Sequence, residues 1–408
     1  MFILALPGLL AVSVAATTYT ITQNYSGSTF FNGWDFQQGV DFTNWGNVSF
    51  QSGPDAQTQG LISVNPAGHA IIKADNTTVG NSTTYVRASV LMSTQAKVNQ
   101  GIWFYFQLSI CRMGAYMHYL CYTYDLNPLL DYSCSVWPSF WTLGGDASNW
   151  PQYGEIDIVE NVNLATQNQY SLHTSENCTH PEATTGVETG TIGPTDCWNE
   201  TAFNSGCIVR ENQPNNYGAR FAQNGGGGIA FLWDEIGMRF WFFPRPNIPA
   251  DFSTGSPNPS NWGLPSALYP QATCDFSTHF GPQTLKLEID ICGGYAGVPG
   301  IFDRGGLCQG LCVDLVPNPR NYDTAYFEIE YLRIFTENAV ETSLSSASSS
   351  ASSSASSSSS PRQTSATSTS LTGKTGAASS ILALPWDFLG FISVSTILAF
   401  LTSLYVLQ

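Results

Sequence analysis

Short apolar runs separated by glycine, proline and asparagine recur along most of the chain. The runs are rich in β-branched and aromatic residues, and no long apolar stripe of period 3.6 stands out among them. This pattern predicts strands rather than helices, and strands spaced in this way favour a sandwich of two sheets. Aromatic residues at 13 %, with 37 glycines and 22 prolines, are typical of an all-β protein with many turns. The clearest predicted strands are 61–64, 70–74, 85–91, 229–233, 238–243, 285–291 and 325–335.

One apolar run carries three carboxylates. The stretch 153–163 reads Y-G-E-I-D-I-V-E-N-V-N, with Glu155, Asp157 and Glu160 among isoleucine and valine. On a helix, Glu155 and Glu160 would point about 140° apart and could not meet at one ligand. On a regular strand, Glu155 and Asp157 share a face and Glu160 points to the other. A β-bulge at Val159 would return Glu160 to the first face, with the two glutamate Cα atoms roughly 13 Å apart.

The carboxylates follow a segment rich in tryptophan. W-P-S-F-W occupies 137–141 and N-W-P occupies 149–151. Aromatic rings beside carboxylates suit a sugar ligand, because the C–H faces of sugar rings stack on indoles. A strand with an acidic face toward solvent is the alternative interpretation, but the neighbouring tryptophans favour a catalytic one.

The motif G-E-I-D-I-V-E resembles the Glu-x-Asp-x-x-Glu signature of glycoside hydrolase family 16, and most of all that of the fungal endo-1,3(4)-β-glucanases. The resemblance runs from about Phe30 to Phe335. It implies a concanavalin A-like β-jelly-roll sandwich whose concave sheet forms a glycan-binding cleft, and cleavage within a polymer. Further matching segments are F-F-N-G-W-D-F at 30–36, S-L-H-T-S at 171–175, W-F-F-P-R at 241–245, N-P-S-N-W-G at 258–263, I-C-G-G-Y-A-G at 291–297 and A-Y-F-E-I-E-Y-L-R-I at 325–334.

The resemblance also implies catalytic roles. Glu155 would be the nucleophile that forms a covalent glycosyl-enzyme, and Glu160 the general acid and then the general base. Asp157 would be an electrostatic and hydrogen-bonding partner of the nucleophile. The neighbouring charge and partial burial are expected to raise the pKa of Glu160. Retaining enzymes of this kind hold the two carboxyl groups about 5–5.5 Å apart.

Four aromatic residues are candidates for binding the substrate. Trp141 and Trp150 flank the catalytic strand in the sequence and are the first choices for stacking on sugar rings. Trp137 fits stacking and core packing equally well. Tyr295 stands where the fungal relatives carry a tryptophan, which implies a weaker or differently specific subsite.

Two polar residues complete the predicted substrate-binding set. His173 matches a family histidine near the catalytic pair and would bond the sugar or Asp157, with a core position as the alternative. Asn99, in V-N-Q-G before a predicted strand, is expected to face the cleft.

Three functions remain open at this point. The first is hydrolysis of β-1,3- or mixed β-1,3(4)-glucan, the expected polysaccharide partner. The second is transglycosylation, in which the glycosyl-enzyme passes to another sugar rather than to water. The third is a glycan-binding wall protein without catalysis, against which the intact set of Glu155, Asp157 and Glu160 argues.

Composition excludes other classes of function. Charged residues are only 11 % of the chain and the net charge is −16, so nucleic acid, which needs a basic patch, is not an expected partner. The 10 cysteines are an even set that can pair under oxidising conditions. Their spacings and the five histidines give no zinc pattern, and no metal or cofactor is predicted.

Both ends of the chain predict export. Residues 1–16 read as a secretory signal peptide, cut near Ala16, ahead of a catalytic domain at 17–338 that we expect to be monomeric. The serine- and threonine-rich stretch 339–375 predicts a disordered, O-glycosylated stalk. Residues 376–408 match a signal for a GPI anchor, with a transmembrane helix as the alternative. The expected location is the outer face of the plasma membrane or the cell wall. Sequons for N-glycosylation occur at Asn24, Asn47, Asn76, Asn81, Asn177 and Asn199.

One segment departs from the family, at 103–132. It has no counterpart between the matching segments on either side, so we interpret it as a retained intron or, alternatively, a genuine insertion. If it is genuine, its Cys111 and Cys121 can pair with each other, and the remaining eight cysteines are still an even set. Sequencing the transcript across Gly101 to Cys134 distinguishes the two interpretations.

Overall fold

The computed structural model describes residues 18–338 apart from 82, 84, 109–132 and 184–185. For 103–108 it describes the backbone only. The predicted signal peptide, the stalk and the C-terminal anchor therefore lie outside the described residues, as do Cys111 and Cys121. No helix within the described ranges is long and apolar enough to cross a membrane.

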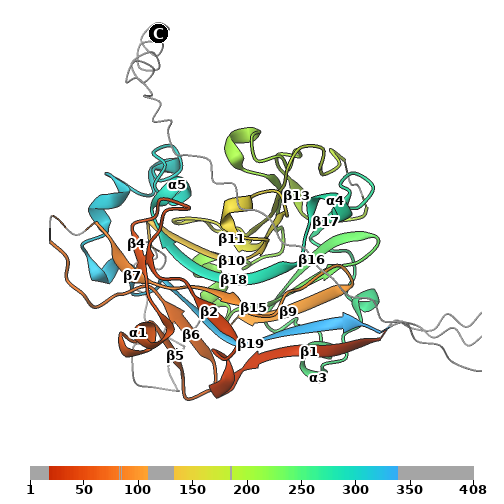
Figure 1. The fold of residues 1–408 in the computed structure, drawn as a ribbon, viewed down its shortest axis with the longest axis horizontal. Coiled ribbons are helices and arrows are strands. Elements are labelled where there is room, and N and C mark those ends of the chain that lie inside the picture. Colours follow the sequence, from red (N-terminus) through yellow and green to blue (C-terminus); the bar gives the residue numbers. More distant parts are fainter. Residues whose placement is uncertain (1–17, 82, 84, 109–132, 184–185, 339–408) are drawn as a thin grey trace, which may run out of the picture. The chain divides into compact units, whose positions relative to one another are not determined.

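Two large antiparallel sheets form the body of the domain (Figure 1). The strands of the first follow the order β17-β16-β15-β9-β19-β6-β5, and β1 also pairs with β19. Its strands are β17 (Ala267–Pro270), β16 (Gly237–Pro244), β15 (Gly227–Trp233), β9 (Ile102–Leu108), β19 (Tyr326–Glu337), β6 (Ala70–Lys73), β5 (Ile62–Val64) and β1 (Tyr19–Ser26).

The second sheet carries the three carboxylates on its strand β11. Its order is β13-β14-β12-β11-β10-β18-β8-β2. A small third sheet, β3-β4-β7, lies after β2 in the chain. The strands of the second and third sheets are β13 (Thr191–Ile192), β14 (Cys207–Arg210), β12 (Gln169–His173), β11 (Glu155–Glu160), β10 (Val136–Gly144), β18 (Gln283–Ile291), β8 (Leu91–Thr94), β2 (Trp34–Phe36), β3 (Gly39–Val40), β4 (Val48–Phe50) and β7 (Arg87–Ser89).

Helices occur as single short turns between strands. The α-helices are α1 (Gly53–Thr58), α2 (Gly218–Gln223), α3 (Asp251–Thr254), α4 (Phe276–His279) and α5 (Gly293–Ala296). The 3-10 helices are η1 (Gly27–Thr29), η2 (Ala147–Asn149), η3 (Ala202–Asn204), η4 (Pro259–Asn261), η5 (Arg304–Gly306), η6 (Cys312–Leu315) and η7 (Pro319–Tyr322).

The core lies between the two large sheets. On β18, Leu285, Leu287 and Ile289 are fully buried in one hydrophobic cluster with Phe231 of β15 and Ile329 of β19. Each such side chain contributes about 1.5–3 kcal/mol when it is removed from water. Since strand side chains alternate, the residues between these leucines and isoleucines point to the opposite face of the second sheet. That face carries the candidate site.

The predicted two-sheet sandwich is confirmed. All seven predicted strands are present, although 85–91 is divided into β7 and the start of β8. Residues 103–108 of the segment 103–132 belong to β9, which pairs with β15 and β19 in the middle of the first sheet. The rest of that segment lies outside the described residues, and its interpretation as a retained intron or an insertion stays a prediction.

Eight of the cysteines form four disulfides, which confirms paired cysteines. The bonds are Cys134–Cys308, Cys178–Cys274, Cys197–Cys207 and Cys292–Cys312. Two of them join segments 96 and 174 residues apart in the chain, which restricts the unfolded state most strongly.

Candidate active site

A β-bulge in β11 brings the three carboxylates to one face. In the pairing with β10, Asp157 lies opposite Trp141 and Val159 opposite Phe140, so Ile158 is the additional residue. The pairing of β11 with β12 is also interrupted between Asp157 and Glu160, over Ile158 and Val159. The predicted bulge is confirmed, but its extra residue in this register is Ile158 rather than Val159. Ile158 and Val159 are both buried in the core.

Asn168 holds this bulge. Its side-chain oxygen accepts a hydrogen bond from the backbone N–H of Glu160 at 3.0 Å, and its amide nitrogen donates to the carbonyl of Ile158 at 2.9 Å. A bulge leaves these backbone groups without a partner on the neighbouring strand, and an unpaired buried group costs about 1–3 kcal/mol. Sequence analysis did not select Asn168, since only the observed register reveals which groups the bulge frees.

Matching polar residues on β12 surround the carboxylates. Gln169 lies opposite Glu160, and Ser171 lies opposite Asp157. The Ser171 hydroxyl donates to Asp157 at 2.7 Å, and the Gln169 amide donates to Glu160 at 3.5 Å. Both residues were missed, although polar and apolar positions alternate in Q-Y-S-L-H and indicate a polar strand face.

Two tryptophans donate hydrogen bonds to the two glutamates. The indole N–H of Trp150 donates to Glu155 Oε2 at 2.8 Å, and that of Trp137 donates to Glu160 Oε1 at 2.9 Å. Both tryptophans are half-buried. Trp137 therefore belongs to the site rather than the core. Trp150 follows η2, which places its ring beside β11.

His173 joins the carboxylates from the end of β12. It lies opposite Glu155, and its Nε2 is 3.3 Å from Asp157 Oδ2, with only 7 % of the residue exposed. Its ring centroid is 6.1 Å from that of Trp150. Of the positions predicted for His173, the contact with Asp157 is the one that the structure contains.

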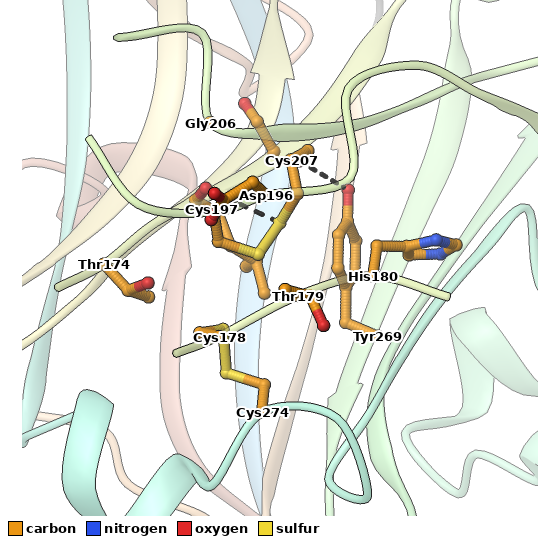
Figure 2. The surroundings of a disulfide bond; sticks show 12 residues. Thr174, Cys178, Thr179, His180, Asp196, Cys197, Gly206, Cys207, Tyr269 and Cys274 are labelled. Atoms are coloured by element: carbon orange, nitrogen blue, oxygen red, sulfur yellow. Dashed lines mark hydrogen bonds between the residues drawn. A yellow bond between two sulfur atoms is a disulfide. The ribbon is translucent and has the colours of Figure 1, made fainter. Parts of the chain in front are cut away.

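Gly206 packs against the ring of His173 and directly precedes a disulfide. A Cβ on Gly206 would lie 2.4 Å from the carbonyl oxygen of Leu172 and 3.1 Å from two atoms of the His173 ring, and the φ of Gly206 is +63°. Only glycine allows this approach without strain. The next residue is Cys207, bonded to Cys197, and its carbonyl accepts from Tyr269 at 3.2 Å (Figure 2).

Burial makes Glu155 and Glu160 hold their protons more tightly. Desolvation, followed by the charge of Asp157, raises the pKa of Glu155 from 4.5 to about 8 and that of Glu160 from 4.5 to about 7. The positive charge of His173 opposes both shifts. Despite desolvation, the hydrogen bond to Asp157 and the charges of Glu155 and Glu160 raise the pKa of His173 to about 9. The expected rise for Glu160 is present, and Glu155 shares it. Around neutral pH the two glutamates can therefore hold one proton between them.

Trp141 and Tyr295 lie on the same side of the sheet. Trp141 is opposite Asp157, half-buried, and Lys286 Nζ lies 5.3 Å from the centroid of its ring. The ring of Tyr295 meets that of Trp137 edge to face at 5.4 Å. Asn99 is exposed in the loop before β9 and stays a prediction.

Strand β18 extends the polar face with charges that sequence analysis did not use. Lys286, Glu288 and Asp290 alternate with buried leucine and isoleucine, a pattern visible in L-K-L-E-I-D-I. They lie opposite Trp141, Ser139 and Trp137 of β10 in the sheet register. The site therefore continues two strands beyond β11.

One group of side chains has the arrangement of a cation site. Ligand atoms of Glu155, Asp157 and His173 all lie within 4.8 Å of one another. The same atoms are engaged with Trp150 and Ser171 and with each other, and a double displacement between two carboxyl groups needs no metal.

Comparison with known proteins agrees with this geometry. The family model described as the XgeA-like, catalytic GH16 domain matches residues 116–335. A probable glycosidase of Schizosaccharomyces pombe is 37% identical over 79% of this chain and 70% of its own length. A probable endo-1,3(4)-beta-glucanase of Aspergillus niger is 31% identical over 83% of this chain, which spans only 43% of that relative.

Two solved structures share the fold. Laminarinase 16A of Phanerochaete chrysosporium, with β-glucans in its donor and acceptor sites, superimposes with a TM-score of 0.69 at 30% identity, covering 78% of this chain and 100% of that one. An elongating family 16 β-1,3-glucosyltransferase gives a TM-score of 0.67 at 30% identity over the same shares. The sandwich is thus the family's β-jelly roll, and this chain belongs to glycoside hydrolase family 16.

Proposed function

We propose that this protein is a retaining endo-β-glucanase that hydrolyses β-1,3- or mixed β-1,3(4)-glucan. The observation that carries the proposal is the bulged strand β11, which presents Glu155 and Glu160 to the same face with Asp157 between them. Each glutamate receives an indole N–H, and the pKa of each is raised toward neutrality. Such a pair can supply one anion and one acid at the same pH.

The reaction has two displacements. In the first, the Glu155 carboxylate attacks the anomeric carbon while Glu160 gives its proton to the glycosidic oxygen, so the bond to the leaving sugar breaks. In the second, Glu160 takes a proton from water, whose oxygen attacks the anomeric carbon and releases Glu155. The anomeric configuration is inverted twice and is therefore retained.

The neighbouring side chains assist these steps. Positive charge develops on the sugar ring in the transition state and favours the anionic form of Glu155, which faces it. Trp150 stabilises that anion through its N–H, and the Asp157 charge keeps the Glu160 proton in place until the leaving oxygen requires it. His173 and Ser171 fix the orientation of Asp157.

The substrate class rests on the relatives and on the aromatic residues of the site. The names of several relatives at 31% to 32% identity specify endo-1,3(4)-beta-glucanase activity, and Laminarinase 16A carries bound β-glucans. Trp137 and Trp141 lie four residues apart on β10, and with Tyr295, which packs on Trp137, they offer apolar ring faces for sugars. The names of these relatives also support cleavage within a polymer rather than at its end.

Transglycosylation is the second candidate, favoured by the similarity to an elongating glucosyltransferase at 30% identity. Both reactions share the glycosyl-enzyme and differ in what attacks it. A glycan-binding wall protein without catalysis is disfavoured, because a lectin has no need of three carboxyl groups on one strand face with a histidine against Asp157.

Incubation of the secreted protein with laminarin and with lichenan, followed by sizing of the products, tests the proposal. Shorter chains support the hydrolase and longer chains the transferase. Unchanged chains, together with retention of the protein on the polymer, would leave only the binding function. The ratio of rates on the two polymers gives the preferred linkage.

The four disulfides support secretion, since such bonds persist outside the cytosol. We therefore place the mature enzyme, as a monomer, at the cell surface or wall, tethered through its C-terminal segment. Release of activity from membranes by a phosphatidylinositol-specific phospholipase supports a lipid anchor, and activity that stays with the membrane supports a helix.

A further inference from the structure

The loop between β3 and β4 presents a tryptophan to solvent. Trp45 is 73 % exposed, whereas tryptophan side chains are mostly buried in folded proteins. Its φ is 59°, in the left-handed region that bulky residues rarely adopt. Phe42, three residues earlier, is also 73 % exposed. An exposed ring on a strained backbone is maintained only where the surroundings impose it, and such positions gather at functional sites.

The loop is held in this shape by Asp41. Its carboxylate is buried and accepts hydrogen bonds from the backbone N–H of Thr43 at 2.9 Å, of Asn44 at 3.1 Å and of Gly46 at 2.7 Å. The hydroxyl of Thr43 donates to it as well, at 2.6 Å. The backbone on both sides of Trp45 is therefore fixed before any ligand arrives, which lowers the entropy lost on binding.

The same loop is fastened to the end of β18 and to α5. The carbonyl of Asn44 accepts from the N–H of Gly294 at 2.7 Å, and the N–H of Asn47 donates to the carbonyl of Ile291 at 2.7 Å. The backbone of Gly46 lies against the side chain of Asp290, whose Oδ1 is 1.7 Å from the point that a Cβ would occupy. No other residue fits there.

These contacts place Trp45 at the rim of the active-site face. Asp290 lies opposite Trp137 in the register of β18 and β10, and Trp137 donates to Glu160. Gly294 precedes Tyr295, whose ring contacts that of Trp137 at 5.4 Å. The loop of Trp45 therefore lies next to the Trp137–Tyr295 pair, and Trp137 in turn contacts Glu160, the proposed acid.

We infer that Trp45, in the same loop as the exposed Phe42, is a stacking platform for sugar residues of a long β-glucan that lie beyond those next to the cleaved bond. The inference rests on the proposed function, because it extends the same substrate. A neutral polysaccharide is the class of ligand that fits, since an exposed indole binds the C–H face of a sugar and the loop offers no free cation for an anionic partner among its described residues 41–47. The platform would favour long chains over short ones.

The test compares polymer with oligosaccharide in the full-length protein. For Trp45→Ala, the KM for laminarin is expected to rise about three- to tenfold, the loss of one aromatic contact, with kcat unchanged. The KM for laminaritriose is expected to stay the same, because this substrate is too short to reach the rim. Trp45→Phe should bring the KM for laminarin most of the way back to the wild-type value. Ile236→Ala removes an apolar side chain that is 61 % exposed in the turn between β15 and β16, and serves as the matched control.

Three results would overturn the inference. One is an unchanged KM for laminarin in Trp45→Ala, and another is an equal loss for laminarin and laminaritriose. The third is the same loss in Ser49→Ala, which removes the sequon at Asn47 and would assign the binding to a glycan there. Binding of laminarin to Glu155→Gln with and without Trp45→Ala, measured by calorimetry, decides the question without hydrolysis. If the wild-type protein cleaves no glucan, the proposed function fails while this comparison still tests the platform.

Discussion

Two groups of carboxyl groups lie on or beside the second sheet. The proposed catalytic trio is the buried Asp157 with the half-buried Glu155 and Glu160, and the second cluster is Asp41, Glu288 and Asp290, all three buried. Burial raises the pKa of Glu288 to about 8 and that of Asp290 well above its ordinary value, and in both cases neighbouring carboxylates add to the rise. Desolvation therefore acts alike in both groups.

The two groups differ in what faces their oxygens. Trp150, Ser171 and Trp137 each donate to one member of the trio, and His173 adds a positive charge. At the second cluster the donors face Asp41 and one oxygen of Asp290, whereas Asp290 Oδ2 and Glu288 Oε1 have no hydrogen-bond partner within the described part of the chain. Burial also lowers the pKa of the neighbouring Lys286. Donors aimed at an oxygen stabilise an anion there, so the tryptophan N–H groups on Glu155 and Glu160 suit a pair that exchanges one proton during a reaction. Glu288 Oε1 and Asp290 Oδ2 lack such donors, which favours the protonated form of these two groups.

The largest difference between the groups is expected in activity. Glu155→Gln and Glu160→Gln should each lower kcat on laminarin at least about 10³-fold, because each removes a group that acts in the transition state. Glu288→Gln, which exchanges a neutral acid for a neutral amide, should change kcat less than about threefold. Steady-state rates of the three purified variants, with circular dichroism as a control for folding, give the comparison. Equal losses in all three would remove the distinction between the groups.

Asn168→Ala tests the β-bulge that brings the three carboxyl groups to one face of β11. It leaves the N–H of Glu160 and the carbonyl of Ile158 unpaired, and the position of Glu160 then loosens. We expect kcat to fall about 10- to 100-fold through misplacement of the acid, with a modest loss of thermal stability. Gln57→Ala, an exposed change in α1, serves as the control. Full activity in Asn168→Ala would mean that the bulge persists without this residue.

The pH dependence of activity sharpens the electrostatic part of the comparison. With both glutamates shifted upward from 4.5, the alkaline limb of kcat/KM is expected near pH 7 to 8, where the pair loses its last proton. Asp157→Asn removes a negative charge that, after burial, is the largest cause of the raised pKa values of Glu155 and Glu160. Its effect on these pKa values exceeds the opposing effect of His173. The limb should therefore move to lower pH, with kcat reduced roughly tenfold. A limb that stays in place would show that Asp157 does not set the proton affinity of the pair.

The smallest predicted effect is on stability. Because the pKa of Glu288 is higher in the folded state than its ordinary 4.5, the folded state loses stability as pH rises from 4.5 to about 8. Glu288→Gln removes this loss. Its Tm should exceed that of the wild type by roughly 3–6 °C at pH 9 and equal it at pH 4. Differential scanning fluorimetry at the two pH values measures this, and a gain of the same size at both would point to packing instead.

How far the sequence could predict this architecture depends on whether local pattern or long-range contact decides. Alternation within β18 and β19 and the β-branched residues of β11 are local, so the strands and the sandwich were predicted. The bulge was predicted because on a regular strand Glu160 would point to the face opposite Glu155 and Asp157. Its position was predicted one residue late in the β10 register, since Asn168, eight residues after Glu160, determines which carbonyl is freed.

Other features have no local signal. The donors to Glu155 and Glu160 come from Trp150 and Trp137, and their N–H directions depend on tertiary packing. Disulfide pairing depends on which loops meet, as for Cys134 and Cys308. The left-handed backbone of Trp45 is imposed by Asp41, four residues before it, and by β18, far along the chain.

The central claim is that Glu155 and Glu160 act on one sugar from the same face, through a covalent intermediate. The most direct measurement is the configuration of the first-formed product, followed by proton NMR during early hydrolysis of laminarin. The account predicts that the β-anomer appears first and the α-anomer only later, by mutarotation. Initial release of the α-anomer would contradict it, since the two carboxyl groups would then be separated by a water molecule, as in inverting enzymes.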